Sequence, residues 1–76
     1  MTRYRGAQAV TLADVQVELN WIKSAADEGD DEKAHAMEAD LFRSVLRDIA
    51  YGVDNAPDLA AAALMSLDID FQRWHA

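Results

Sequence analysis

The chain contains no cysteine, so it has neither a disulfide framework nor a thiolate for metal binding or nucleophilic catalysis. We therefore expect a cytosolic setting. Glycine and proline are also scarce, and the three glycines stand singly, which excludes a glycine-rich phosphate loop. No run of about 18 apolar residues occurs, and the first residues lack the apolar core of a signal peptide. We expect neither a membrane span nor export by that route.

Basic residues are outnumbered: seven lysines and arginines stand against fourteen acidic residues, which gives a formal net charge of -7. Two of the bases, Arg3 and Arg5, fall in a segment that we expect to be frayed. Nucleic-acid binding depends on phosphate neutralisation by clustered Lys and Arg, and the chain has no such cluster. Direct nucleic-acid binding is therefore not expected. An acidic surface would instead speed encounter with a basic protein partner.

With 76 residues, the chain can build one small core. We predict a flexible N-terminal arm over residues 1–10 and a single helical domain over residues 11–76. In the first helix, Thr11 and Asp14 form a predicted capping box, and Gly29 is the predicted C-terminal stop. Spacings of three and four predict one buried face. The residues of that face are Leu12, Val15, Leu19, Ile22 and Ala26.

A second helix is predicted from about Asp31 to Tyr51, with Asp30 as its N-cap and Gly52 as its stop. Its apolar residues form two adjoining rows, which is typical of a central helix packed on both sides. The first row is Ala34, Met37, Leu41 and Val45, and the second is Phe42, Leu46 and Ile49.

A third helix is predicted from an Asn55 cap, through Pro57 in its first turn, to about Leu67. Its predicted inner face consists of Leu59, Ala60, Ala63, Leu64 and Leu67. Asp70 can cap one further turn that places Phe71 and Trp74 on the same side, and we expect these aromatics to fold back over the end of the bundle. The predicted fold is all-α: a three-helix bundle with a short C-terminal helical turn.

The most acidic stretch, "AADEGDDEKAHAME", raises the question of a metal site, because His35 and Glu38 share a helical face. It lacks the ligand count of a di-iron bundle and the register of a calcium loop, so we expect no metal and no cofactor. Its acids conflict with the helix dipole at the end of the first helix, which makes the turn either a contact for a basic partner or only a solvated surface. The candidate contact residues are Asp27, Glu28, Asp30, Asp31 and Glu32.

Val17 and Trp21 form a second candidate site, because helical geometry places them on the side opposite the Leu12 to Ala26 face. Exposed aromatic residues dominate binding energy at interfaces. We predict an interface here, most simply a two-fold homodimer in which each Trp21 packs against its mate. Two alternatives remain open: the N-terminal arm with Tyr4 covers the Trp, or the surface binds another protein.

From Glu32 onward the sequence offers "EKAHAMEADLFRSVLRDIA", an Asp-Asn-Ala-Pro turn, an alanine-rich helix and "LDIDFQRWHA". This pattern resembles a group of small helical proteins of actinobacterial phages and prophages that share a terminal Asp-Phe-x-x-Trp. The resemblance implies a bacterial or phage-infected cytoplasm, and the group has no assigned activity to carry over.

No serine lies in a nucleophile elbow, and neither histidine has an evident catalytic partner, so we do not expect an enzyme. The predicted function is that of an acidic helical protein-interaction module, encoded by a phage or prophage and acting on a host or phage protein. The alternative is a DNA-mimicking inhibitor of a nucleic-acid-binding host or defence protein. A small metal-dependent enzyme is a third possibility, which the ligand count disfavours.

Overall fold

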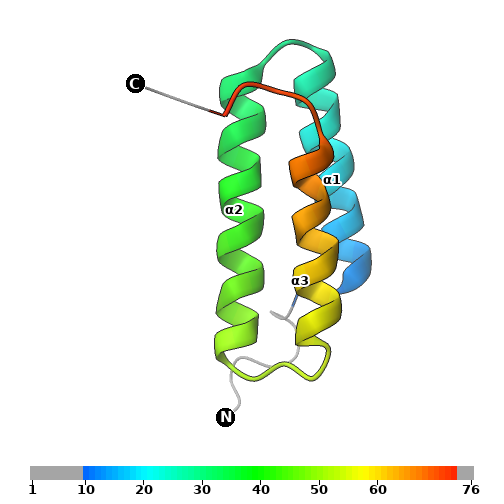
Figure 1. The fold of residues 1–76 in the computed structure, drawn as a ribbon, viewed down its shortest axis with the longest axis vertical. Helices are drawn as coiled ribbons and strands as arrows, with labels where there is room; N and C mark the ends of the chain where they lie inside the picture. Colours follow the sequence, from blue (N-terminus) through cyan, green and yellow to red (C-terminus); the bar gives the residue numbers. More distant parts are fainter. Residues whose placement is uncertain (1–9, 74–76) are drawn as a thin grey trace.

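Three helices run side by side in a computed structural model that describes residues 10–73 (Figure 1). They are α1 (Leu12–Asp27), α2 (Asp31–Ala50) and α3 (Ala56–Leu64), and a 3-10 turn, η2 (Met65–Asp68), follows α3 directly. Tight turns join the helices, so α2 runs antiparallel to both of its neighbours, and α3 also packs on α1. The all-α three-helix bundle is confirmed. Within the described residues, no helix is long and apolar enough to cross a membrane.

The predicted helix ends are confirmed where side chains or glycines define them. The Asp14 amide donates to the Thr11 hydroxyl at 3.0 Å and the Thr11 amide donates to the Asp14 carboxylate at 3.1 Å, which completes the capping box. The Asp30 carboxylate caps α2 by accepting from an amide of its first turn. Gly29 and Gly52 adopt φ values of 81° and 88°, where a side chain would be strained.

The third helix is shorter than predicted, because the α-helix ends at Leu64 and tightens into η2. The tighter winding turns Ser66 fully into the interior, where its hydroxyl donates to the carboxylate of Glu38. Asn55 stands at the predicted N-cap, but its side chain makes no capping hydrogen bond. Pro57 lies in the first turn, as expected.

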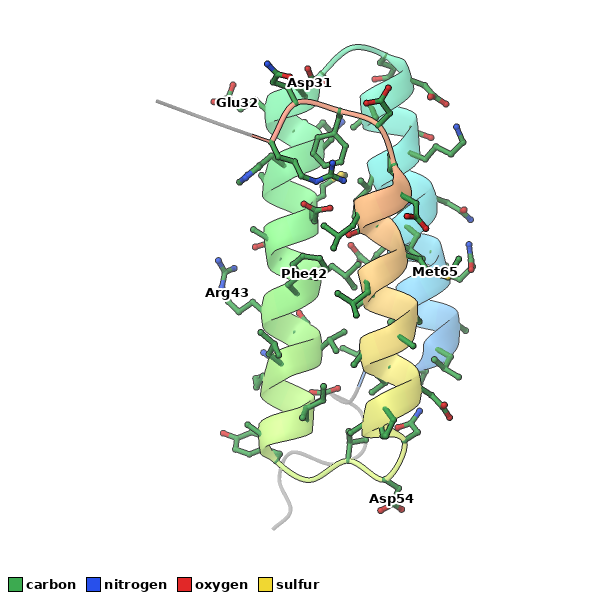
Figure 2. The ribbon with its side chains drawn as sticks, in the orientation of Figure 1. Asp31, Glu32, Phe42, Arg43, Asp54 and Met65 are labelled. Carbon is green, nitrogen blue, oxygen red and sulfur yellow. The ribbon has the colours of Figure 1, made fainter. Side chains whose placement is uncertain are left out.

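One row of apolar side chains from each helix forms the core. The prediction was wrong for four leucines: Leu12, Leu46, Leu64 and Leu67 are exposed, because α3 covers α1 and α2 along one narrow face. Phe42 points from α2 toward α3 and is half-buried (Figure 2). On α1 the fully packed alanine is Ala25, whereas the predicted Ala26 is half-buried. The core consists of Val15, Leu19, Ile22, Ala25, Ala34, Leu41, Val45, Leu59 and Ala63.

The C-terminal segment returns from η2 across the end of the bundle to α2 (Figure 1). The predicted helical turn at Asp70 is absent from residues 70–73, and the helical turn that does exist is η2. Phe71 is half-buried and packs against the core, as expected. Trp74, Tyr4 and the predicted flexible arm, apart from Val10, lie outside the described residues.

Leu41→Ala should lower the free energy of unfolding by about 2 to 5 kcal/mol, because Leu41 is only 3% exposed and truncation leaves a cavity. Met65→Ala is the matched control: Met65 is exposed, so its truncation should change stability by less than about 0.5 kcal/mol. Denaturant unfolding followed by circular dichroism measures both. Equal stability of the two variants would show that Leu41 is not a core residue.

Candidate functional site

A groove of about 410 Å³ follows the seam between α1 and α2, and we call it the α1–α2 groove. Trp21 is 53% exposed and Val17 is 46% exposed. Both point away from the core, as expected, but they lie beside α2 rather than on an isolated outer side of α1. The groove is lined by Val10, Asp14, Val17, Glu18, Trp21, Asp40, Leu41 and Ser44.

Three carboxylates accompany the apolar side chains of the α1–α2 groove. Asp40 lies 2.6 Å from Arg43, but both side chains are mostly exposed and such pairs contribute little stability. Asp14 accepts from the Thr11 amide in the capping box. Glu18 is half-buried, and no cation within residues 10–73 pairs with it. The groove therefore combines an apolar wall with three carboxylates, of which Glu18 has no cationic partner within residues 10–73.

The acidic turn that joins α1 to α2 lies outside this groove. Asp27 pairs with Lys23 at 3.2 Å, and Asp30 is occupied in capping α2. Figure 2 places Asp31 and Glu32 at the start of α2, where carboxylates stabilise the helix dipole. The five predicted contact residues are Asp27, Glu28, Asp30, Asp31 and Glu32, and none of them lines the groove. Asp30 therefore has a capping role and Asp27 an ion-pair partner, and contact of this turn with a basic protein stays a prediction.

The acidic turn also gathers no metal-ligand set. Across residues 10–73, no three His, Asp or Glu side chains are arranged so that they could hold a metal ion. His35 has an interaction partner, and its charge acts on Glu38, the other residue of the proposed ligand pair. Glu38 itself is directed into the bundle and is not available on the surface.

A second groove, of about 320 Å³, lies between α2 and α3, and we call it the α2–α3 groove. Leu46 and Leu64 are 63% and 57% exposed, and they come from opposite sides of the groove. Every lining residue is apolar. The lining consists of Phe42, Val45, Leu46, Ile49, Ala60, Ala63 and Leu64. The two grooves thus lie on different flanks of α2 and differ sharply in charge.

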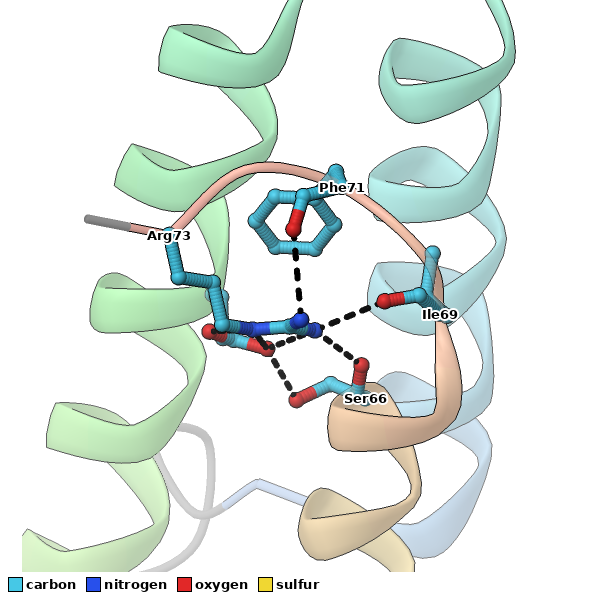
Figure 3. A network of polar contacts seen from close by, with 5 residues as sticks. Ser66, Ile69, Phe71 and Arg73 are labelled. Carbon is cyan, nitrogen blue, oxygen red and sulfur yellow. Dashed lines mark hydrogen bonds and ion pairs between the residues drawn. The ribbon is translucent and has the colours of Figure 1, made fainter.

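Glu38 is the centre of a polar network that the sequence analysis missed (Figure 3). The Arg73 Nε donates to Glu38 Oε1 at 3.0 Å and the Arg73 Nη2 donates to Glu38 Oε2 at 3.0 Å. The same Nη2 donates to the carbonyl oxygens of Ser66 and Ile69 at 2.7 and 2.9 Å. The guanidinium carbon of Arg73 also lies 3.9 Å from the centre of the Phe71 ring, which is a cation–π contact. This network ties the C-terminal segment to α2.

Burial alone would raise the pKa of Glu38, because it disfavours the charged form. Hydrogen bonds from Arg73 and Ser66, together with the positive charges of Arg73 and His35, outweigh burial and hold the pKa of Glu38 below its ordinary value. Glu38 is therefore a carboxylate at neutral pH. Ser66 is fully buried and its hydroxyl donates to this carboxylate at 2.7 Å, so the pair is enclosed by the fold.

Asp48 is a second buried carboxylate of α2, with no exposed surface. Its Oδ2 accepts from the Val10 amide at 2.6 Å, which fixes the chain just before α1 against the end of α2. Its Oδ1 accepts no hydrogen bond from residues 10–73, and the Arg47 Nε lies 3.9 Å away. Asp48 therefore anchors the start of α1.

The sequence held a signal for both buried carboxylates. Ala34, Glu38, Leu41, Val45 and Asp48 follow at spacings of four and three, so the acids occupy the buried row of α2. The predicted row used Met37 in place of Glu38, and Met37 is only half-buried. Acids in a core row indicate carboxylates with buried hydrogen-bond or ion-pair partners, but here the Arg73 side chain and the Val10 amide are 35 and 38 residues away in the chain.

Comparisons with protein-family models, with curated proteins and with solved structures give no significant match to this chain. The resemblance to small phage and prophage proteins therefore stays a prediction. The two grooves and the distribution of charge between them are the features of the described residues that bear on function.

Glu38→Gln should lower the free energy of unfolding near neutral pH by about 2 to 4 kcal/mol, because the charge-assisted bonds from Arg73 are lost in a buried site. The pKa of Glu38 is lower in the folded state than in the unfolded state. The contribution of its carboxylate to the free energy of unfolding is therefore complete above the unfolded-state pKa, and it is lost as pH falls through the folded-state pKa. The variant should therefore lose less stability than the parent as pH falls from about 5 into the acid range.

Denaturant unfolding across this pH range measures the effect. Asp40→Asn is the matched control, because Asp40 is an exposed acid on the same helix and its removal should leave the acid dependence almost unchanged. If Glu38→Gln has the acid dependence of the parent, the Glu38 carboxylate does not contribute in the way that its contacts indicate.

Proposed function

We propose that this protein is a small protein-interaction module that binds a basic, amphipathic segment of a partner protein in the α1–α2 groove. The observation that carries the proposal is the exposure of Trp21 and Val17 inside a groove that also presents three carboxylates. Aromatic residues are common anchors of protein interfaces, and an apolar patch with a polar rim is typical of an interaction site.

The apolar wall of the groove fits an apolar anchor residue of the partner. Val10, Val17, Trp21 and Leu41 come from the N-terminal approach, α1 and α2, so a segment lying along the seam contacts all three. Grooves between two helices commonly accept an amphipathic helix, whose apolar residues recur at spacings of three and four. The volume of about 410 Å³ accommodates several side chains of such a helix.

The carboxylates of the groove determine the charge of the partner. Asp14, Glu18 and Asp40 lie among the lining residues, and no lysine or arginine does. Glu18 is half-buried, so a cation placed beside it interacts in a medium of lower dielectric than bulk water. The net charge of -7 adds long-range attraction that raises the association rate of a basic partner. The fitting segment carries Lys or Arg on both sides of its apolar residues.

Charge also argues against a second copy of this chain in the α1–α2 groove. A two-fold contact through Trp21 would bring Asp14, Glu18 and Asp40 of one copy toward the same three carboxylates of the other. Like charges that face each other oppose association. A basic partner therefore fits this groove better than the homodimer that the sequence suggested for Trp21.

The DNA-mimicking inhibitor is the alternative function. Such a mimic would hold its partner through carboxylates spread over a face, whereas here Val17 and Trp21 interrupt the acids. The mixed character of the groove favours an amphipathic protein segment. On the resemblance to phage and prophage proteins, we propose further that the module acts on a host or phage protein in a bacterial cytoplasm.

A synthetic helical peptide with a leucine face flanked by lysines is the probe for this function, and its counterpart with glutamates in place of lysines is the negative control. The lysine peptide should bind, and Trp21→Ala should weaken binding at least about tenfold, because an aromatic anchor is lost. Met65→Ala, a truncation at an exposed residue outside both grooves, should bind as the parent does. Calorimetry measures all six combinations of the two peptides with the parent and the two variants.

Two double variants distinguish binding by the carboxylates of the α1–α2 groove from attraction to the acidic surface as a whole. Glu18→Gln with Asp40→Asn removes two charges from the groove, and Glu28→Gln with Glu32→Gln removes two from the acidic turn. We expect only the first pair to weaken binding strongly and to reduce its dependence on salt. If both pairs weaken binding equally and Trp21→Ala does not, the proposed groove is wrong and the DNA-mimicking alternative is favoured.

A further inference from the structure

We propose that two copies of this chain associate through the α2–α3 groove, which leaves the α1–α2 groove of each copy free. This inference goes beyond the proposed function, because it concerns a different flank of α2 and does not depend on any partner binding. The surface involved consists of the groove lining and Leu67, and we call it the α2–α3 face. Its members are Phe42, Val45, Leu46, Ile49, Ala60, Ala63, Leu64 and Leu67.

The first argument is charge. A chain with a net charge of -7 repels a second copy of itself wherever carboxylates face each other. The α2–α3 groove is lined by seven apolar residues and by no charged or polar one, so two copies can meet there without that repulsion. Arg43, which follows Phe42 on α2, points away from the bundle (Figure 2). The α1–α2 groove, by contrast, would confront three carboxylates with three.

The second argument is shape. Leu46 of α2 and Leu64 of α3 protrude on opposite sides of the groove, and both are more than half exposed. Between them lie the small side chains of Ala60 and Ala63. One surface therefore contains both a projecting apolar side chain and a recess of about 320 Å³. A two-fold contact requires this self-complementarity, because each copy supplies the ridge and the hollow at once.

The third argument is area. A specific interface takes roughly a tenth of the surface of a small protein on each side, which for this chain is about 500 Å² of the 4988 Å² of accessible surface. Leu67 extends the groove along η2: it follows Leu64 by one turn and is 51% exposed. Leu46, Leu64 and Leu67, each more than half exposed, are the large apolar side chains that such a contact covers.

The consequence is a bivalent molecule. Phe42, Leu46 and Ile49 belong to the α2–α3 face, whereas Asp40, Leu41 and Ser44 of the same helix line the α1–α2 groove. Because the two sets lie on different flanks of α2, dimerisation and binding of a basic segment do not compete. A dimer presents two such grooves, and a partner with two basic segments binds it more tightly than either segment alone.

Light scattering coupled to size-exclusion chromatography tests the proposal on the full chain. The parent should have twice the mass of the 8.4 kDa chain at high concentration and should dissociate on dilution. Leu46→Glu should raise the dimer dissociation constant at least about 100-fold, because the two-fold axis places the substitution in the interface twice. Met65→Glu adds the same charge at an exposed residue outside the groove and should leave the dissociation constant within about threefold of the parent.

Cross-linking provides a second test, which does not require a charge to be introduced. The chain has no cysteine, so Leu46→Cys and Met65→Cys each carry a single thiol. A short bis-maleimide should link two copies of Leu46→Cys and should leave Met65→Cys unlinked. A parent that is monomeric at every concentration overturns the proposal, and so does equal weakening by the two glutamate variants or equal cross-linking of the two cysteine variants.

Discussion

The packing of α2 against both other helices is the constraint on which the rest of this structure depends. A helix that gives one row of side chains to the core keeps two flanks beside that row, and in α2 these flanks meet α1 on one side and α3 on the other. The flank toward α3 is not closed completely, because α3 is only nine residues long and many of its side chains are alanine methyls. The flank toward α1 also leaves a groove, which is lined by residues of α1, α2 and Val10. Both grooves follow from this arrangement, and α2 contributes residues to each.

The chemistry of the two flanks differs because α2 carries different residues on either side of its buried row. Toward α1 it presents Asp40 and Ser44, and Glu18 and Trp21 of α1 complete a groove that is both apolar and acidic. Toward α3 it presents Phe42, Leu46 and Ile49 without any charge. Because the chain is strongly acidic, this difference in charge is the reason that we propose a different occupant for each groove. Repulsion between copies disfavours self-association at the first groove and leaves it unopposed at the second.

The buried carboxylates of α2 perform a structural task at each end of the bundle. Glu38 holds the C-terminal segment through Arg73, and Asp48 holds the start of α1 through the Val10 amide. Burying a charge is unfavourable unless its partners are close and well oriented, and the bonds from Arg73 and Ser66 supply such partners for Glu38. Apolar side chains at these positions would fill space but would not fix the two chain segments in one position, because hydrogen bonds are directional.

The sequence by itself determined the helices and most of the core. Local signals sufficed for the capping box of Thr11, the Asp30 cap and the two left-handed glycines, because each acts within a few residues of the chain. The spacing of Val15, Leu19 and Ile22 likewise specified a buried face. Even the buried position of Glu38 and Asp48 was encoded in the period of α2, although the partners of these acids were not.

The tertiary structure alone decided which apolar residues stay exposed and which polar residues meet. Leu46 and Leu64 fit a helical core pattern as well as Leu41 and Leu59 do, and only the short, narrow contact of α3 leaves the first pair outside. Trp21 of α1 and Asp40 of α2 line the same groove only because the two helices pack side by side. Arg73 reaches Glu38 across 35 residues of chain because the C-terminal segment crosses the end of the bundle. Such contacts depend on how helices are placed in space, whereas periodicity describes each helix separately.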